Sequence, residues 1–234
     1  MKFRQLIPVV AVACAASAAT PGFAAKAANY TAVERHQILL TYAACVLGES
    51  REAALDLALE AERDTEKALS SKACAQRSAG AYFTKVRIPR EVMVGALSEV
   101  LLAKLDLTGL DPLIASAPAP TPLRALAVED FDPRRGAKRA EFVVDLPRLN
   151  EMRSFMSASA CATHAEPAKV RAVFQAPFGS HEETGAISAI VPVLANCMQG
   201  GELRLRPDQL RLALATGYLR LARQADPTLR KKLI

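Results

Sequence analysis

The chain has 234 residues, 51% of them hydrophobic, and a formal net charge of +6. This length accommodates one or two domains. The chain contains no tryptophan and few other aromatic residues, which argues against a large aromatic ligand platform. The same shortage argues against nucleic-acid binding, because bases would need aromatic side chains on which to stack.

The first 25 residues have the pattern of a secretory signal peptide. Lys2 and Arg4 begin it, an apolar stretch follows, and Gly22 and Ala24 are the small residues expected before a cleavage site. Cleavage near Ala24 would leave about 209 residues with a net charge of about +4, located in the periplasm or secreted. The alternatives are an uncleaved membrane anchor and a lipoprotein attached through Cys14.

Residues 29–104 are expected to form a first unit of four helices. Thr31 and Glu34 match a capping box, in which each side chain accepts a hydrogen bond from an otherwise unpaired backbone N–H. The other expected boundaries are a helix end at Gly48, a second helix after Ser50, a third from Asp64 or Thr65 to about Cys74, a short strand over residues 81–86, and a fourth helix from Pro89 to about Lys104.

Residues 105–147 differ in composition and are expected to connect two units. Residues 115–122 are rich in proline, so they are expected to form neither a helix nor a central strand. A charged loop over residues 128–139 follows, and Phe142–Leu146 could form one strand.

Residues 148–225 repeat the order of the first unit. A basic tail over residues 226–234 follows, and we expect it to be frayed. The expected boundaries of the second unit are a helix from about Leu149 to Cys161, a helix from Pro167, a helix capped by Ser180 and Glu183 that reaches Cys197 with a kink at Pro192, an extended segment over residues 203–205, and a last helix from Pro207.

The cysteines support this organisation. Once Cys14 leaves with the signal peptide, four remain, and an even number in an oxidising compartment predicts two disulfides. Three pairings exist, and the repeat favours Cys45 with Cys74 and Cys161 with Cys197, since each unit then closes on itself. The fold class predicted is mainly α: two related four-helix units, stapled by disulfides, with minor short strands.

A helix that ends at a cysteine, a short helix, a helix that runs to a second cysteine and a helix that starts at proline are expected twice in this order. The arrangement resembles that of uncharacterised exported proteins of α-proteobacteria. The resemblance implies an exported helical protein, and it implies no known activity.

One group of residues suggests metal binding. Cys161, His164, His181 and Cys197 supply two thiolates and two imidazoles, which is a ligand set for zinc. The first unit has the cysteines without the histidines, so a function shared by both cysteine pairs would not be metal binding. We expect no metal and no cofactor, and we keep a zinc-binding protein or an enzyme centred on these residues as the alternative.

Basic residues gather near the C-terminus. Arg211, Arg220 and Arg223 lie on the last helix of the second unit and are candidates for a surface that binds an anionic partner. In the envelope, that partner would be an anionic surface or another envelope protein, and we expect no nucleic acid.

The sequence contains no Gly-x-Ser-x-Gly and no His-Glu-x-x-His motif. His36 is expected to be a packed or surface residue, and Glu52, Asp56 and Glu60 to form a solvated stripe on one helix. The sequence therefore favours a non-enzymatic binding or scaffold protein of the cell envelope.

Overall fold

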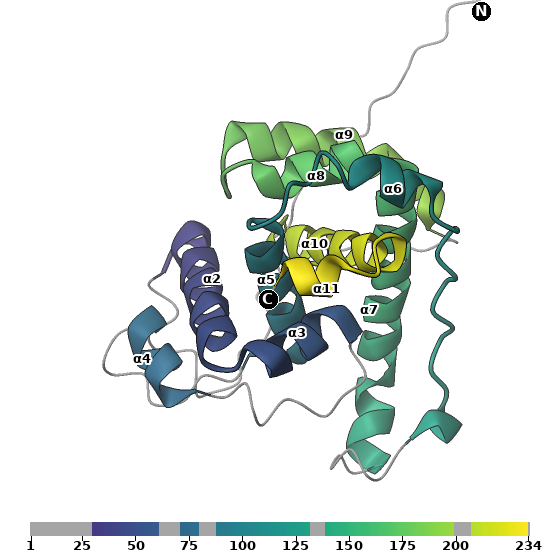
Figure 1. The fold of residues 1–234 in the computed structure, drawn as a ribbon. Helices are drawn as coiled ribbons and strands as arrows, with labels where there is room; N and C mark the ends of the chain where they lie inside the picture. The colour runs from purple at the N-terminus through teal and green to yellow at the C-terminus, as the bar shows by residue number, and fades with distance from the viewer. Residues whose placement is uncertain (1–29, 61–70, 80–87, 132–138, 199–206, 234) are drawn as a thin grey trace, which may run out of the picture.

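The computed structural model describes residues 30–60, 71–79, 88–131, 139–198 and 207–233. All regular secondary structure in these ranges is helical, which confirms the mainly α fold (Figure 1). In chain order the elements are α2 (Ala32–Glu49), α3 (Arg51–Glu60), α4 (Lys72–Ala79), α5 (Arg90–Leu102), α6 (Asp111–Ser116), the 3₁₀ turn η2 (Val128–Asp130), α7 (Arg139–Ala165), α8 (Pro167–Gln175), α9 (His181–Cys197), α10 (Pro207–Ala225) and α11 (Leu229–Lys232).

Two helices, α5 and α10, cross at the centre of the molecule. A Cβ atom at Gly95 of α5 would lie 2.5 Å from Leu212 Cβ and 2.9 Å from Leu212 O of α10. Glycine therefore permits the backbones to approach this closely. Around this crossing, α10 also contacts α3, α6, α7 and α8, and most of its side chains between Leu210 and Ala222 are buried.

The two halves of the chain place their helices in the same order. In the first half α2 packs against α3, α4 and α5, and in the second half α7 packs against α8, α9 and α10. A disulfide links the first helix to the third in each half, Cys45 to Cys74 and Cys161 to Cys197. The duplication stays a prediction, since element order alone does not establish common descent.

The halves share one hydrophobic core. Leu97 of α5 and Leu214 and Tyr218 of α10 are fully buried in a single cluster to which both halves contribute. The Tyr218 hydroxyl donates to Leu107 O, 3.0 Å away, and to Asp111 Oδ1, so α10 is tied to the segment after α5. Burial, together with the hydrogen bond and charge of Asp111, raises the pKa of Tyr218 above its ordinary value.

Several predicted helix starts are confirmed. Glu34 N donates to Thr31 Oγ1 (3.2 Å) and Thr31 N donates to the Glu34 carboxylate (2.7 Å), which completes the capping box. The bond from the Thr31 backbone lowers the pKa of Glu34 below its usual range. Pro167 and Pro207 are the first residues of α8 and α10, where a missing N–H costs little. Pro89, predicted to begin the fourth helix, instead precedes the first residue of α5 as its N-cap.

The cap of α9 differs from the expectation. Ser180 Oγ accepts from Glu183 N at 3.1 Å, as predicted. The Glu183 carboxylate, however, accepts from Gly179 N at 2.7 Å and not from Ser180 N. Gly179 has φ 77°, a left-handed conformation that favours glycine.

The predicted strand Phe142–Leu146 is wrong, since these residues lie within α7. A short apolar run does not distinguish a strand from a helix. That helix begins at Arg139, before Leu149, and continues through Pro147. The possible strands over residues 81–86 and 203–205 lie outside the described residues.

Two predictions in the first half are also wrong. The helix that carries Cys74 begins at Lys72 and continues to Ala79, and does not end at the cysteine. The start proposed for it at Asp64 or Thr65 lies outside the described residues. Gly48 does not end α2 in a left-handed conformation, because the helix continues to Glu49.

The Pro-rich connector is fixed against α7. Its first two residues, Ala115 and Ser116, end α6, contrary to the expectation that no helix forms there. Beyond them, Leu123 N donates to Ser157 Oγ (2.8 Å), and Leu126 exchanges hydrogen bonds with the amide of Asn150 (2.6 and 2.9 Å).

The basic tail is docked and not frayed over its described part. Leu229 and Leu233 are buried, and Arg230 forms an ion pair of 2.7 Å with Asp56 of α3. Asp56, which was expected to be solvated, therefore binds the tail through this ion pair. Arg51 of α3 also donates a hydrogen bond to Leu233 O, which adds a second contact between the tail and α3.

Candidate functional site

A groove of about 850 Å³ lies where α2, α5 and the end of α8 meet. This volume falls within the usual range for small-molecule sites. Six large apolar side chains form part of its wall: Leu40, Val100, Leu102, Leu105, Leu107 and Phe174.

The charged side chains at the groove divide into exposed cations and one buried anion. Arg77 of α4 and Lys104, which follows α5, are both exposed. Glu99 is buried and engages Arg211 and His36. The charge that the groove presents to an incoming ligand is therefore positive.

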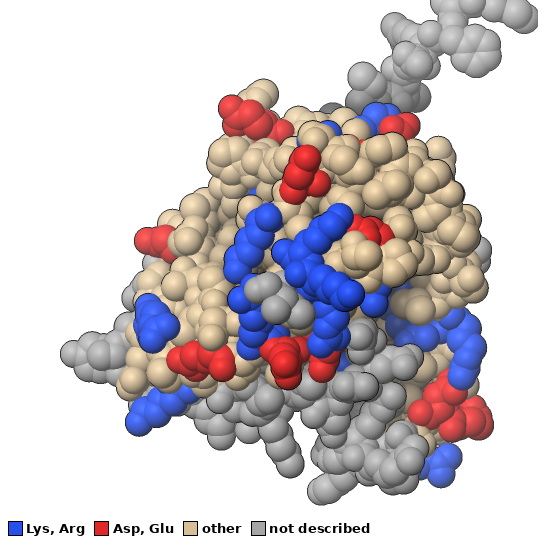
Figure 2. Space-filling view, viewed as in Figure 1, with Lys and Arg blue, Asp and Glu red and all other residues tan. Residues whose placement is uncertain are grey.

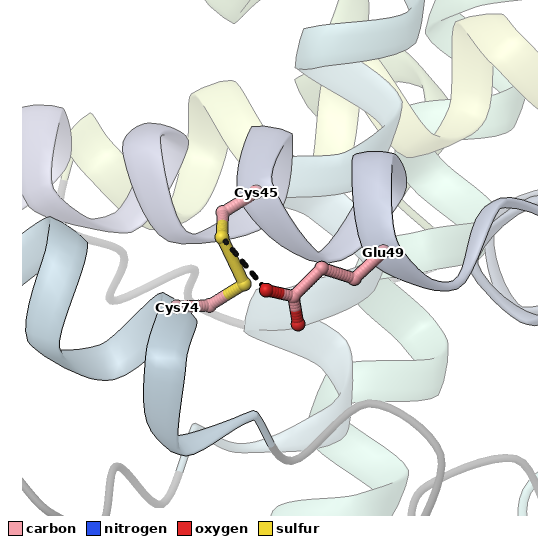
Figure 3. Close-up of side chains that lie close together, drawn as sticks. All are labelled: Cys45, Glu49 and Cys74. Carbon is pink, nitrogen blue, oxygen red and sulfur yellow. Dashed lines mark hydrogen bonds between the residues drawn. A yellow bond between two sulfur atoms is a disulfide. The ribbon is translucent and has the colours of Figure 1, made fainter.

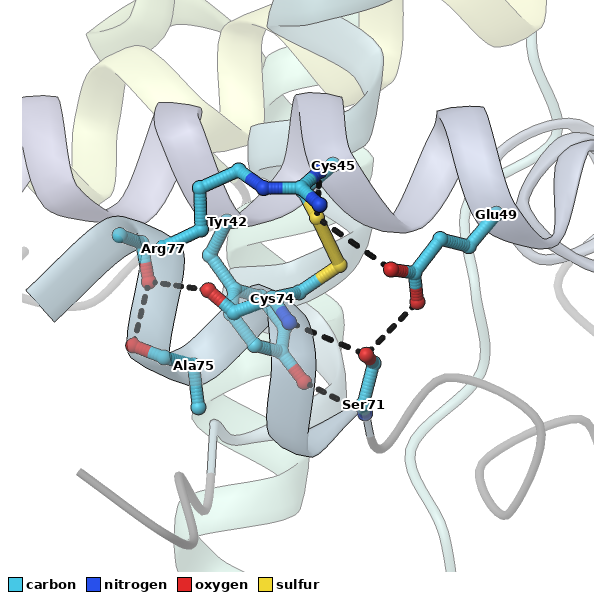
Figure 4. Close-up of a disulfide and its surroundings, with 8 residues drawn as sticks. Tyr42, Cys45, Glu49, Ser71, Cys74, Ala75 and Arg77 are labelled. Atoms are coloured by element: carbon cyan, nitrogen blue, oxygen red, sulfur yellow. Dashed lines mark hydrogen bonds between the residues drawn. A yellow bond between two sulfur atoms is a disulfide. The ribbon is translucent and has the colours of Figure 1, made fainter. Parts of the chain in front are cut away.

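Cys45 of the Cys45–Cys74 disulfide is among the residues that line this groove. The disulfide joins α2, four residues before its end, to the first turn of α4 (Figure 3). Arg77, one turn further along α4, donates from Nη1 to Cys45 Sγ at 3.0 Å, so a guanidinium contacts this disulfide (Figure 4).

Ser71 organises the start of α4 beside the disulfide (Figure 4). Its hydroxyl accepts from Cys74 N (3.1 Å) and donates to Glu49 Oε2 (2.7 Å), while its backbone N–H donates to the Tyr42 hydroxyl (3.2 Å). The other carboxylate oxygen of Glu49 lies 3.9 Å from Cys45 Sγ. These contacts hold the carboxylate of Glu49, the last residue of α2, next to the sulfur atoms.

Cys45, Glu49 and Cys74 place three potential metal-ligand atoms within 4.8 Å of one another. Metal ligation by cysteine requires the thiolate, and both sulfur atoms are bonded to each other here. In the oxidised state, this cluster is a cross-link and not a metal site.

A buried ionic network lies on the α8 side of the groove. The Arg211 side chain is 5% exposed and pairs with Glu99 (2.7 Å) and Glu183 (2.9 Å). His36 Nε2 lies 3.3 Å from Glu99, and its ring stacks on Phe178 with 4.1 Å between centroids.

Arg211 also binds the end of α8. Nη1, which donates to Glu183, reaches the carbonyl oxygens of Val173 (2.8 Å) and Ala176 (2.8 Å), and Nη2 donates to Phe174 O (2.7 Å). A helix end leaves such carbonyls without partners, so Arg211 caps α8 while it pairs with carboxylates from α5 and α9. The network thereby joins both halves of the chain.

Glu99 is the ionised acceptor of this network. Burial alone would raise its pKa, but hydrogen bonds from His36 and Arg211 and the charge of Arg211 outweigh burial. The pKa of Glu99 therefore lies below its usual range, and the carboxylate stays charged at neutral pH.

The structure does not assemble the zinc site considered from the sequence. Cys161 and Cys197 are joined in a disulfide, and His164 Nε2 lies 2.7 Å from Ala117 O. His181 begins α9 and Cys197 ends it, sixteen residues later, which puts them about 24 Å apart along the helix axis. These four residues cannot share one metal ion.

Arg211 is wrong as a surface-binding residue, because it is buried. Arg220 and Arg223 are half-buried on the same helix. Burial, together with the charge of Arg90, lowers the pKa of Arg220. Arg223 donates to Pro227 O at 3.0 Å. Neither is the free surface cation that we expected.

Basic side chains nevertheless gather in the middle of one face, over α11 and the described end of the chain (Figure 2). Intramolecular pairs offset part of this charge, including Lys232 with Asp226 at 2.7 Å and Arg230 with Asp56 at 2.7 Å. The groove, which combines apolar walls with two cations, has the more specific shape and chemistry.

Sequence reasoning did not identify Arg77, Glu99, Lys104 or Glu183 as functional candidates. Arg77 could have been noticed, since it lies three residues after Cys74 and one helical turn away. Glu99 lies in the apolar second half of α5, between Leu97 and Leu101, and a charge there indicates a buried partner. The identity of that partner, Arg211, depends on tertiary packing.

No family model, no curated protein and no solved structure matches this chain. Within the described residues, no helix has both the length and the apolar character needed to cross a membrane.

Proposed function

We propose that this chain is an exported helical protein of the cell envelope, stapled by two disulfides, that acts by binding and not by catalysis. The observation that carries the proposal is the groove of about 850 Å³, with apolar walls and the cations Arg77 and Lys104. Its ligand would be an amphipathic anion, with an apolar chain for the walls and an acidic group for the cations.

The chemistry of the walls supports this ligand class. Each buried methylene of an acyl chain contributes about 0.8 kcal/mol, so a chain of moderate length suffices for binding. Glu99 would repel an anion, but Arg211 and His36 face its carboxylate. An acidic group near Lys104 therefore meets a positive potential.

The polar lining supports binding over catalysis. Among the described residues that line the groove, the one side chain with a hydroxyl group is Thr41. This hydroxyl donates a hydrogen bond to Gln37 O at 2.8 Å. A nucleophilic hydroxyl would need a general base beside it, and this one is engaged with the backbone of its own helix.

Calorimetric titration of the oxidised protein with three probes of equal chain length tests the proposal. Dodecanoate is expected to bind at least tenfold more tightly than dodecanol, and dodecylamine more weakly than either. Lys104→Glu is expected to weaken dodecanoate binding about tenfold and to strengthen dodecylamine binding.

Lys169→Glu is the matched control, because Lys169 is exposed on α8 and pairs with Glu166 outside the groove lining. It is expected to leave all three affinities unchanged. Equal binding of dodecanol and dodecanoate, no binding of any probe, or equal effects of the two variants would each overturn the proposal.

A further inference from the structure

The two disulfides differ in their electrostatic surroundings. Cys45 and Cys161 occupy the same position, each four residues before the end of its helix, α2 or α7. Cys74, however, is the third residue of α4, in its first turn, and Arg77 contacts Cys45 Sγ at 3.0 Å, whereas Cys197 is the last residue of α9. Helix N-termini and guanidinium groups stabilise thiolates, whereas helix C-termini destabilise them.

We infer that Cys45–Cys74 is a redox-active disulfide that exchanges with an external dithiol, whereas Cys161–Cys197 is a structural cross-link. The inference rests on three features of the first pair: the Arg77 contact, the helix start at Cys74 and the position of Cys45 in the groove wall. It does not depend on the ligand proposed for that groove.

The exchange consists of two displacements. A thiolate of the dithiol attacks Cys45 Sγ from the groove, a new S–S bond forms, and the Cys45–Cys74 bond breaks with its electron pair on Cys74. The second thiol of the reagent then attacks its own sulfur in this mixed disulfide and displaces Cys45 as a thiolate. The dithiol leaves as a disulfide, two electrons have entered the protein, and the two protons of the dithiol are released to solvent or to the new thiolates.

Both leaving groups have a partner that stabilises negative charge. Burial opposes thiolate formation at this pair, since Cys74 is fully buried and Cys45 is 8% exposed, whereas Cys161 and Cys197 are half-buried. The Cys74 thiolate would therefore depend on the N-terminal end of α4. The Cys45 thiolate would depend on Arg77. Stabilised thiolates make a disulfide easier to reduce.

Glu49 opposes the effect, because its carboxylate oxygen lies 3.9 Å from Cys45 Sγ. Arg77 is closer, at 3.0 Å, and its positive charge outweighs the carboxylate at this sulfur. The Ser71 hydroxyl donates a hydrogen bond to the other carboxylate oxygen of Glu49. This bond stabilises negative charge on the oxygen that does not face Cys45.

Alkylation after equilibration with graded ratios of reduced to oxidised dithiothreitol tests the inference. Peptide mass spectrometry of the folded, full-length mature protein reports the reduced fraction of each pair. Half-reduction of Cys45–Cys74 is expected at a reduced-to-oxidised ratio at least tenfold lower than for Cys161–Cys197.

Arg77→Met is expected to raise the ratio needed for Cys45–Cys74 severalfold and to leave Cys161–Cys197 unchanged. Arg77→Lys should restore part of the difference, because it keeps a positive charge. Lys169→Met is the control for charge removal elsewhere. Urea unfolding of each oxidised variant shows whether the fold is intact.

Equal half-reduction ratios for the two pairs, earlier reduction of Cys161–Cys197, or an equal shift of both pairs in Arg77→Met would overturn the inference. These readouts require no ligand. A failure here therefore leaves the proposed binding function untouched, and the reverse also holds.

Discussion

At the scale of single residues, Arg211 has the largest structural role. It is 4% exposed, and its guanidinium binds two carboxylates, from α5 and α9, and three backbone carbonyls at the end of α8. A buried charge is tolerated only when it is paired and hydrogen-bonded. The cost of burial explains why so many partners converge on one side chain.

Arg211→Met is expected to destabilise the oxidised protein by about 3–5 kcal/mol, because it leaves the carboxylates of Glu99 and Glu183 buried without their common partner. Urea unfolding followed by circular dichroism measures the change. Lys169→Met, an exposed cation on α8, should stay within about 0.5 kcal/mol of the parent. A loss below about 1 kcal/mol for Arg211→Met would show that the network contributes little.

At the scale of elements, the crossing of α5 and α10 sets the architecture. The contact at Gly95 involves the Leu212 backbone oxygen, which cannot move aside as a flexible side chain could. A second close approach lies at Gly217 of α10, where a Cβ atom would be 3.3 Å from the backbone of Ser159 and Ala160 in α7. Small residues thus let α10 approach helices of both halves.

Gly95→Ala is expected to destabilise the protein by about 1–3 kcal/mol through overpacking, although alanine favours helix by about 0.8–1.0 kcal/mol relative to glycine. Gly185→Ala in α9 is the matched control, since a Cβ atom there has no neighbour within 4 Å. It should stabilise the protein by up to about 1 kcal/mol. Thermal unfolding of the two variants compares them directly, and a stabilised Gly95→Ala variant would contradict the observed packing.

Local signals predicted the elements better than they predicted the site. The capping box at Thr31 and the proline starts at Pro167 and Pro207 depend on short-range chemistry, and the structure contains them. The repeated order of elements favours the cysteine pairing, which the structure also contains. The role of Arg211 depends on which helices surround α10. From the sequence, an arginine that follows Leu210 on a helix is expected to be exposed to solvent. Only the central position of α10 in the fold shows that it is buried.

At the scale of the whole molecule, the two halves pack around a shared core and not as two separate bundles. The core continues from α5 across α10 to α7 and α8. The ionic network crosses the same boundary, from His36 and Glu99 to Glu183 and Arg211. Loss of packing at the centre should therefore affect both halves together.

Leu214→Ala is expected to cost about 2–5 kcal/mol, because Leu214 is completely buried. Amide hydrogen exchange in the variant should quicken together in α2, α5, α8 and α9 if unfolding is cooperative. Val144→Ala in α7 is a control, since Val144 is 80% exposed. Faster exchange confined to α7–α10 would instead indicate that the halves unfold separately.

The position of α10 in the chain also constrains the order of assembly. In the export that we propose, α2 to α9 reach the oxidising compartment before α10 does. Cys45 and Cys74 are 29 residues apart and can join early, whereas Glu99 and the inner faces of α5 and α7 acquire their neighbour α10 only when it has crossed. A chain whose residues from 207 onward have not yet crossed would lack the central helix of its core, and it would expose apolar surfaces of the kind that chaperones and proteases recognise.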